Sequence, residues 1–296
     1  MRFVIAGSSG FLGTALRDRL ARDGHQVTRL IRGEAPAPSE SSWDPSAGDI
    51  DDEVVAAADV VVNLAGAPIA RWPWSESYKQ TLLASRVQTT QTVAAAIERT
   101  GAKAALVNGS GMNAYGHAGD QVCDESTPRG SGFLADVVEQ WEGATEAAKT
   151  AGARVVWLRS GVVLHPDGGT LGLMKTPFRL GLGGRIGSGE QWFSTVSRED
   201  WVSAVVFLAE NPDANGPFNL VGPEPVTNAE FTKTLGEVLG RPTVIPVPST
   251  PLRLVAGELS QELLGSLRVV PHALLDAGFT FAHPDVRASL LAGFNR

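Results

Sequence analysis

The first residues that could do chemistry are the glycines of Gly7-Ser-Ser-Gly10-Phe-Leu-Gly13, which lie between a short apolar run and an amphipathic segment. Glycines at this spacing let the chain turn tightly after a strand, and the N-terminus of the following helix offers unpaired N–H donors to a pyrophosphate. An ordinary strand-to-helix turn is the alternative. In its strand–turn–helix context the pattern predicts a dinucleotide site. Its predicted contact residues are Gly7, Ser9, Gly10, Phe11, Leu12 and Gly13.

The residues at the end of the second predicted strand indicate which dinucleotide would bind. NAD-binding proteins usually place an acid there, which holds the ribose 2′-hydroxyl. This chain has Ile31-Arg32-Gly33 instead, and a guanidinium can bind a 2′-phosphate through charge-assisted, bidentate hydrogen bonds. We therefore expect NADP(H) rather than NAD(H), with Ile31 and Arg32 at the adenosine end. A solvent-exposed arginine in a loop is the alternative.

The elements that must position this turn alternate along the chain. Short β-branched runs predict strands at Arg2–Ala6, Gln26–Ile31, near Ser42–Asp44, Val60–Leu64, Ala104–Asn108 and Arg154–Leu158. Helical periodicity predicts helices at Phe11–Asp23, Asp52–Ala57, Glu76–Arg99 and Phe133–Ala151. This alternation is typical of an α/β fold with a doubly wound parallel sheet, the Rossmann fold.

The character of the chain changes after about Gly161, where stretches rich in glycine and proline separate shorter helical segments. Helices are predicted there at Asp200–Glu210, Asn228–Leu239 and Leu252–Leu264. We expect a dinucleotide-binding domain at residues 1–165, to which residues 198–222 return, and a small C-terminal cap domain at residues 166–296. Loops of such a cap would close over a cleft.

Composition narrows the class of partner. The chain has 296 residues, with 25 Lys and Arg against 32 Asp and Glu, a net charge of −7. This balance attracts neither nucleic acid nor an anionic membrane, so a small-molecule ligand is the expected partner. The single cysteine, Cys123, cannot form an intramolecular disulfide, and no Cys or His cluster has metal-ligand spacing. We expect a reducing, cytoplasmic location and no metal.

Further motifs in order along the chain carry a resemblance to a known superfamily. They are Asn63-Leu-Ala-Gly66, Ser85-Arg86-Val-Gln-Thr-Thr90, Trp141-Glu142, Leu158-Arg-Ser-Gly-Val-Val-Leu164, Pro177-Phe-Arg-Leu-Gly-Leu-Gly-Gly184, Gly187-Ser-Gly-Glu-Gln-Trp192 and Pro225-Val-Thr-Asn228. With the glycine turn, this series resembles the extended short-chain dehydrogenase/reductase superfamily. Within that superfamily it is similar to the epimerase family, a cell-division-inhibitor-like group of nucleotide-sugar epimerases.

The resemblance implies further contacts to the cofactor. The residues that would line it are Leu64, Ala65, Gly66, Arg86 and Val163. Packing within the sheet is the alternative for Leu64, Ala65 and Val163, and a solvated helix face is the alternative for Arg86.

The usual catalytic pair of that superfamily is absent. It consists of a tyrosine and, four residues later, a lysine that lowers the tyrosine pKa, with a nearby Ser or Thr that orients the substrate. Counting back from Glu142, the corresponding positions hold Leu134 and Val138, and neither can carry a proton. The remaining candidates are Ser110 as the orienting hydroxyl and Tyr115 as an acid, if burial and the cofactor lowered its pKa. An aromatic side chain that packs beside the cofactor is the alternative for Tyr115.

Other polar residues of the expected cleft have ordinary structural alternatives. His117 and the pair Asp124-Glu125 are proton-transfer candidates by residue type. The alternative is that they are ordinary polar residues of loops. Members of the epimerase family usually carry a histidine at the position of Ser197, shortly before an acid that corresponds to Asp200. A role that needs this histidine is therefore not expected in this chain. Candidates for substrate contact in a glycine-rich loop are Arg185, Gln191 and Trp192.

Two functions fit these features. The first is an atypical NADP(H)-dependent reductase or epimerase that acts on a small ligand through Ser110 and Tyr115. The second is a non-catalytic NADP(H)-binding protein whose cap moves with the state of the cofactor, as a sensor or scaffold. The missing tyrosine–lysine pair favours the second function, whereas the complete cleft and cap favour the first.

Overall fold

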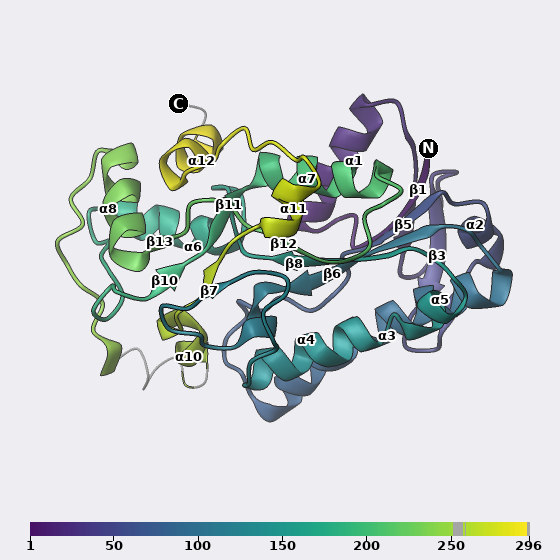
Figure 1. Ribbon diagram of the computed structural model, residues 1–296, viewed down its shortest axis with the longest axis horizontal. Coiled ribbons are helices and arrows are strands. Elements are labelled where there is room, and N and C mark those ends of the chain that lie inside the picture. The colour runs from purple at the N-terminus through teal and green to yellow at the C-terminus, as the bar shows by residue number, and fades with distance from the viewer. Residues whose placement is uncertain (251–256, 258, 295–296) are drawn as a thin grey trace.

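In the computed structural model, which describes residues 1–250, 257 and 259–294, the centre of the molecule is an eight-stranded sheet (Figure 1). The strands are β1 (Arg2–Ala6), β2 (Gln26–Ile31), β3 (Glu40–Asp44), β4 (Asp49–Ile50), β5 (Val60–Asn63), β6 (Ala105–Gly111), β8 (Val155–Ser160) and β12 (Gly216–Leu220). Their order across the sheet is β12-β8-β6-β5-β1-β2-β3-β4, and the neighbours are parallel except β3 and β4. The predicted Rossmann fold is confirmed, because the order reverses beside β1, where such sheets bind their ligands.

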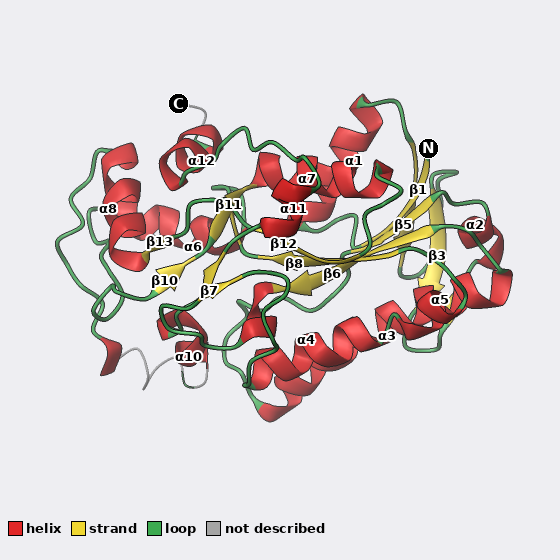
Figure 2. Cartoon of the chain, viewed as in Figure 1, coloured by secondary structure: helices red, strands yellow, loops and turns green. Residues whose placement is uncertain are grey.

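Helices cover both faces of this sheet (Figure 2). In that view α1 (Phe11–Arg22), α7 (Arg198–Glu210) and α11 (His272–Asp276) lie above it, and α3 (Glu76–Thr100), α4 (Phe133–Gly143) and α5 (Glu146–Thr150) lie below it. The short α2 (Asp52–Ala56) packs against α3. Alternation along β1 explains the two layers: Phe3 and Ile5 join the apolar core on the α1 side, and Val4 joins the core on the α3 side.

The long helix α3 begins at the predicted Glu76 and ends at Thr100, one residue beyond the predicted end. The Ser75 hydroxyl accepts a hydrogen bond from the Tyr78 N–H at 3.2 Å and caps the N-terminus. Gly101, with φ +63°, adopts the left-handed conformation that ends the helix. Between these caps, buried Val93 and Ile97 pack against the sheet. Local signals alone therefore place the helix that carries Arg86.

The smaller part of the molecule is the cap, which we define as residues 166–197 and 223–294 within the described ranges. It contains α6 (Gly169–Arg179), α8 (Asn228–Leu239), α10 (Leu259–Leu264) and α12 (Val286–Gly293). Two-stranded sheets join β9 (Val162–Leu164) to β11 (Thr195–Ser197) and β10 (Trp192–Phe193) to β13 (Val226–Thr227). A third pairs β7 (Val122–Cys123) with β14 (Arg268–Val269). The cap has an apolar core of its own around Leu171, Phe231 and Leu290.

The structure corrects several predicted elements. The predicted helix Phe133–Ala151 is two helices, α4 and α5, and the helical conformation is interrupted at Thr145. The Thr145 hydroxyl accepts a hydrogen bond from the Trp157 indole. The strand β12 and the helix α6 have no predicted counterpart. The predicted helix Leu252–Leu264 is described only at Leu259–Leu264, and residues 251–256 and 258 lie outside the described residues.

Residues 198–222 contribute α7, which packs against α1, and β12, which extends the sheet beside β8. The domain limits themselves stay a prediction. No helix within the described residues is long and apolar enough to cross a membrane.

Candidate functional site

The glycine turn lies where β1 meets α1. Gly7 has φ +77°, and its carbonyl oxygen accepts a hydrogen bond from the Gly10 N–H at 3.0 Å. Gly10 is the N-cap residue of α1, and no described side chain caps this helix end. Both Ser9 and Gly10 are exposed. The unpaired N–H groups and positive dipole end of α1 are therefore open to an anion.

The three glycines of this turn have different structural roles. A Cβ on Gly7 would lie 2.7 Å from the Leu64 carbonyl carbon, and a Cβ on Gly13 would lie 2.1 Å from the Gly7 oxygen. Gly10 has an ordinary φ of −74°, and its Cβ would meet only the Gly7 oxygen, at 3.3 Å. Gly7 and Gly13 are thus required to close the turn, whereas Gly10 leaves free the space at the helix N-terminus. This space fits a pyrophosphate held against the backbone.

Arg32 follows β2 at the same edge of the sheet. Its side chain is exposed and makes no ion pair with the described residues, although its charge contributes to the lowered pKa of Asp44, after the larger effect of hydrogen bonds from Ser46. The neighbouring Arg29 is already paired, because its guanidinium binds Glu40. Of these two arginines, Arg32 is the one free to bind a 2′-phosphate. Ile31, the last residue of β2, is half-buried.

A buried polar network holds the loop that follows β5. Asn63 donates its side-chain N–H groups to Asn108 Oδ1 at 2.9 Å and Thr90 Oγ1 at 3.0 Å. Its own Oδ1 accepts the Ala65 N–H at 3.2 Å. These bonds join β5, β6 and α3, and they orient the loop in which Leu64 and Ala65 are half-buried and Gly66 is exposed. Contact of this loop with a cofactor stays a prediction.

Arg86 lies beneath that loop. It is 7% exposed, its Nη1 donates to the Leu82 carbonyl at 2.9 Å, and its guanidinium lies 5.0 Å from the centre of the Trp141 ring. A Cβ on Gly66 would approach Arg86 Cγ to 3.3 Å. Burial lowers the pKa of Arg86 to about 10, which leaves it charged at neutral pH. The alternative that Arg86 lies on a solvated helix face is wrong. Arg86 is a buried cation that forms no ion pair with any described carboxylate.

Phe11 and Val163 are packed by neighbouring protein. The space beside Gly168 is filled by Phe11, since a Cβ there would lie 2.5 Å from Phe11 Cδ2, and the Arg198 guanidinium lies 5.6 Å from the Phe11 ring centre. Val163 is 8% exposed and pairs with Val196 of β11. Leu12 packs in part against the core on the α1 side. The cofactor contacts predicted for these three residues stay predictions.

Ser110 belongs to a buried ionic network. Its hydroxyl donates to Glu142 Oε1 at 2.6 Å, and that oxygen also accepts a hydrogen bond from Arg159 Nε at 2.9 Å. The second carboxylate oxygen of Glu142 accepts hydrogen bonds from Arg159 and Arg129. Burial alone would raise the pKa of Glu142, but the hydrogen bonds and charge of Arg159 outweigh burial and lower it. The Ser110 hydroxyl is therefore engaged with a carboxylate.

Tyr115 lies in the same network, 3% exposed. Its hydroxyl donates to Asn219 Oδ1 at 2.7 Å and accepts a hydrogen bond from Arg159 Nη1 at 3.1 Å. Burial raises the pKa of Tyr115 to about 12, and the opposing effect of Arg159 is smaller. Burial therefore changes the pKa of Tyr115 in the direction opposite to the lowered pKa that the acid role requires. The geometry supports the packing alternative, while the catalytic roles of Ser110 and Tyr115 stay predictions.

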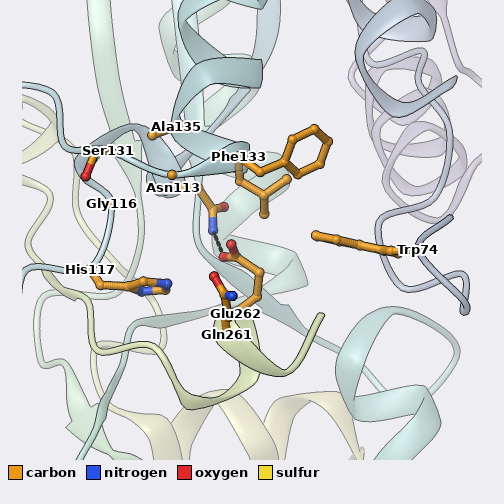
Figure 3. Close-up of a pocket in the computed structure, with 11 residues that line it drawn as sticks. Trp74, Asn113, Gly116, His117, Ser131, Phe133, Ala135, Gln261 and Glu262 are labelled. Atoms are coloured by element: carbon orange, nitrogen blue, oxygen red, sulfur yellow. Dashed lines mark hydrogen bonds between the residues drawn. The ribbon is translucent and has the colours of Figure 1, made fainter. Parts of the chain in front are cut away.

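A cavity of about 50 Å³ opens just beyond the end of β6 (Figure 3). One wall is the start of α4, where Phe133 and Leu134 lie, and Trp74 faces Phe133 edge-on with ring centres 5.6 Å apart. The opposite side holds His117 and, from the cap, Glu262. Leu134 occupies the position where the resembled superfamily has its tyrosine. The cavity therefore lies beside the position at which the sequence analysis expects the superfamily's tyrosine.

Glu262 points into this cavity toward Asn113, which follows β6 in the short 3₁₀ helix η1 (Met112–Tyr115). Asn113 Nδ2 donates to Glu262 Oε2 at 2.9 Å. Burial raises the pKa of Glu262, and the charge of His117 and the Asn113 hydrogen bond oppose that change only in part. The sequence analysis did not select this residue, because nothing local distinguishes Glu262 from other acids of an amphipathic helix.

Comparison with known proteins agrees with this geometry. The profile of the NAD dependent epimerase/dehydratase family matches residues 3–221, from the first strand to the end of the sheet. The chain belongs to this family. A domain of unknown function matches residues 247–292, the segment that carries α10 and Glu262. The resemblance to the epimerase family inferred from the sequence is thereby confirmed.

Relatives within the family align over almost the whole chain. An epimerase family protein of Mycobacterium bovis is 45% identical over 289 residues, which cover 97% of this chain and 95% of the relative. The crystal structure of human epimerase family protein SDR39U1 with NADPH is 36% identical, with a TM-score of 0.90 and full coverage of both chains. A nucleoside-diphosphate sugar epimerase from Corynebacterium glutamicum is 34% identical with a TM-score of 0.79, covering 98% of this chain and 57% of that one.

The other candidate residues have structural partners in this family member. Asp124 accepts hydrogen bonds from Ser126, and Glu125 accepts the N–H groups of Asn219 and Ala273. In the glycine-rich loop, the Gln191 side chain donates to the Ile186 carbonyl at 3.0 Å, and the Trp192 indole donates to Asp120 at 2.9 Å. Arg185 is exposed. None of the three loop candidates lines the cavity of Figure 3.

A histidine from a distant part of the chain lies against Ser197. His283 Nδ1 lies 3.0 Å from Ser197 Oγ and 3.3 Å from Asp200 Oδ2. Asp200 also accepts the His283 N–H at 2.9 Å. The group joins α7 to the segment before α12, and Ser197 caps α7 through the Asp200 N–H. Its geometry is that of a structural clamp at the start of α7.

Proposed function

We propose that the chain is an NADP(H)-dependent oxidoreductase that reduces a carbonyl group, or epimerises a carbon, of a small ligand. The observation that carries this proposal is the pair formed by the open α1 N-terminus at Gly10 and the unpaired, exposed Arg32. Together they present N–H donors to a pyrophosphate and a guanidinium to a 2′-phosphate. The NADPH of the human relative supports this choice of cofactor.

The residues around the turn would hold the cofactor in an extended pose. The α1 N-terminus would bind the pyrophosphate and Arg32 the 2′-phosphate, with Arg86 supplying a buried positive charge below Gly66. Bound NADPH supplies a hydride to an electrophilic carbon. The described cavity beyond β6 would receive the reacting end of the ligand, where the apolar Leu134, Phe133 and Trp74 limit the access of water.

Calorimetry with NADPH and NADH tests the cofactor proposal. We expect tighter binding of NADPH, and Arg32→Ala should remove most of the difference while NADH affinity is unchanged. Loss of a charge-assisted contact corresponds to about 1.5–3 kcal/mol, or roughly 10- to 100-fold in Kd. Arg29→Ala is the matched control, because that guanidinium is already bound to Glu40. Equal affinities of the wild type for the two cofactors would contradict the proposal.

A second candidate function is a non-catalytic NADP(H)-binding sensor or scaffold. The observation that favours it is the engagement of both predicted catalytic groups, Ser110 with Glu142 and Tyr115 with Asn219. Steady-state NADPH oxidation with a panel of aldehydes, ketones and quinones distinguishes the two functions. Tight NADPH binding without turnover of any carbonyl compound would favour the sensor.

A further inference from the structure

The described part of the site lacks the superfamily's own proton donor, and the titratable groups among the residues that line the cavity are His117, which follows η1, and Glu262 of the cap. Leu134 and Val138 stand where the superfamily has its tyrosine and lysine, the Ser110 hydroxyl donates to Glu142, and the Tyr115 hydroxyl donates to Asn219. Reduction of a carbonyl nevertheless requires a proton on the oxygen as the hydride reaches the carbon. The acid for this step therefore has to come from His117 or Glu262, and a hydrogen bond from Asn113 fixes the carboxyl group of Glu262.

The cap contributes a carboxyl group to that cavity. Glu262, on α10, lines it together with Leu134. The Asn113 side chain fixes Glu262 Oε2 by a 2.9 Å hydrogen bond (Figure 3). Glu262 Oε1 makes no hydrogen bond with the described residues. One oxygen is thus held by the protein and the other is available to a ligand.

We propose that Glu262 is the acid–base group of this site, and that the site takes an uncharged carbonyl or hydroxyl compound. This inference rests on the proposed oxidoreductase function. It also gives a role to the segment that matches a domain of unknown function: the segment brings an acid–base group to a Rossmann domain that has Leu134 and Val138 in place of the tyrosine and lysine. Burial, which raises the pKa of Glu262, keeps more of the carboxyl in the protonated form at a given pH.

The proton step balances with the hydride that NADPH supplies. As the carbonyl carbon gains the hydride, the electron pair of the C–O π bond moves to the oxygen, and this oxygen takes the proton of Glu262. The products are an alcohol, NADP⁺ and the Glu262 carboxylate, which regains its proton from solvent. In the reverse direction the carboxylate accepts the hydroxyl proton. Asn113 holds Glu262 Oε2 throughout, so the carboxyl keeps its direction.

The lining of the cavity indicates the charge and shape of the ligand. None of its described lining residues is a lysine or arginine, and the carboxylate form of Glu262 repels anions. Trp74 and Phe133 present aromatic surfaces on the other side. An uncharged compound with a flat apolar group beside its carbonyl matches both features.

Carbodiimide labelling tests the position of Glu262 without measuring activity. A water-soluble carbodiimide with glycine ethyl ester modifies protonated carboxyl groups, and mass spectrometry of peptides locates the label. We expect Glu262 to react up to a higher pH than the exposed Glu139 of α4, and NADPH to protect it. The fragment 2′-phospho-ADP-ribose lacks the nicotinamide and should not protect it. Labelling that is indistinguishable from that of Glu139, or unaffected by bound NADPH, overturns the proposal.

Turnover tests the role of the proton. The probes are the uncharged 4-nitrobenzaldehyde and the anionic 4-formylbenzoate, and only the first should be reduced well. Glu262→Gln keeps an oxygen that accepts the Asn113 hydrogen bond but cannot supply a proton. It should lower kcat about 100-fold with NADPH affinity unchanged. Asn113→Ala removes the hydrogen bond and keeps the acid, so it should cost far less. Equal losses in the two variants, or no loss in Glu262→Gln, overturn the proposal.

The pH profile gives a second readout. The rate of reduction should fall as pH rises through the raised pKa of Glu262, and Glu262→Gln should lose this dependence. His117 is the titratable group that faces Glu262 across the cavity, and α4 presents Phe133, Leu134 and Ala135 to it. His117→Gln should therefore shift the profile but keep its shape. Absence of NADPH binding by calorimetry rejects the proposed function as a whole, whereas intact NADPH binding without reduction of either aldehyde overturns the role of Glu262.

Discussion

Adding the same methyl group at two glycines of the turn should separate cofactor binding from folding. In Gly13→Ala the new Cβ lies 2.1 Å from the Gly7 oxygen, whereas ordinary contacts begin at 3.4 Å. The obstacle is backbone at both ends, so β1 and α1 must move apart. In Gly10→Ala the new Cβ lies 3.3 Å from the same oxygen, and the backbone is already in a conformation that alanine adopts. That variant should fold normally.

The expected magnitudes follow from these distances. Overpacking of this kind costs about 1–3 kcal/mol or more, so Gly13→Ala should lower the free energy of unfolding by at least the upper part of that range. At about 2–4 °C per kcal/mol for a chain of this size class, the Tm should fall by roughly 6–12 °C. Gly10→Ala should change the Tm by no more than about 2 °C, since its misfit is slight.

Gly10→Ala should weaken NADPH binding although it costs little stability, whereas Gly13→Ala should act mainly on stability. The Cβ of Gly10→Ala extends into the space proposed for the pyrophosphate and displaces it from the α1 N–H groups. Loss of such contacts corresponds to about 1.5–3 kcal/mol, or roughly 10- to 100-fold in the Kd of NADPH. The bulkier Gly10→Val should abolish binding while the fold survives.

Thermal unfolding measures the Tm of each variant, and calorimetry measures its Kd for NADPH. The reasoning is refuted if Gly10→Ala binds NADPH as tightly as the wild type, because the space beside Gly10 would then not hold the cofactor. It is also refuted if Gly10→Val unfolds the protein in the absence of cofactor, because the residue would then be required for the turn. A stable Gly13→Ala variant would show that the turn relaxes more easily than its backbone contacts imply.

Two further predictions concern the buried network. Tyr115→Phe keeps the ring but leaves Asn219 and Arg159 each without one hydrogen-bond partner, so it should lower the free energy of unfolding by about 1–3 kcal/mol. The rate of any NADPH oxidation should stay unchanged. A large loss of rate with intact NADPH affinity would restore Tyr115 as the acid. Glu142 has a folded-state pKa below its ordinary value of 4.5, so its contribution to stability is complete above that value and is lost as pH falls through the lower, folded pKa. Glu142→Gln should therefore lower the free energy of unfolding by about 3–5 kcal/mol at neutral pH. It should also make the free energy of unfolding in urea less dependent on pH in the acid range. If the variant loses stability as steeply as the wild type when the pH falls, the titrating group is another residue.

Local sequence determined the Rossmann half of this protein. The glycine turn, the ends of α3 and the alternation of strands and helices each depend on a few neighbouring residues, so composition and periodicity predict them. The absent tyrosine–lysine pair is likewise a property of spacing, since Leu134 and Val138 lie on one short helix. The position of Arg32 was predictable because it directly follows the strand that ends at Ile31, before Gly33 with its positive φ.

Tertiary structure decided what surrounds the reacting end of the site. Asn113 and Glu262 are 149 positions apart in the chain, and their hydrogen bond exists only because the cap places α10 against η1. The segment before α12 brings His283 to Ser197, and the addition of β12 to the sheet brings Asn219 to Tyr115. Periodicity reports only which face of an element is apolar. The partner of a polar side chain depends on how separate elements pack, and that packing is set by the apolar cores on the two faces of the sheet and in the cap together.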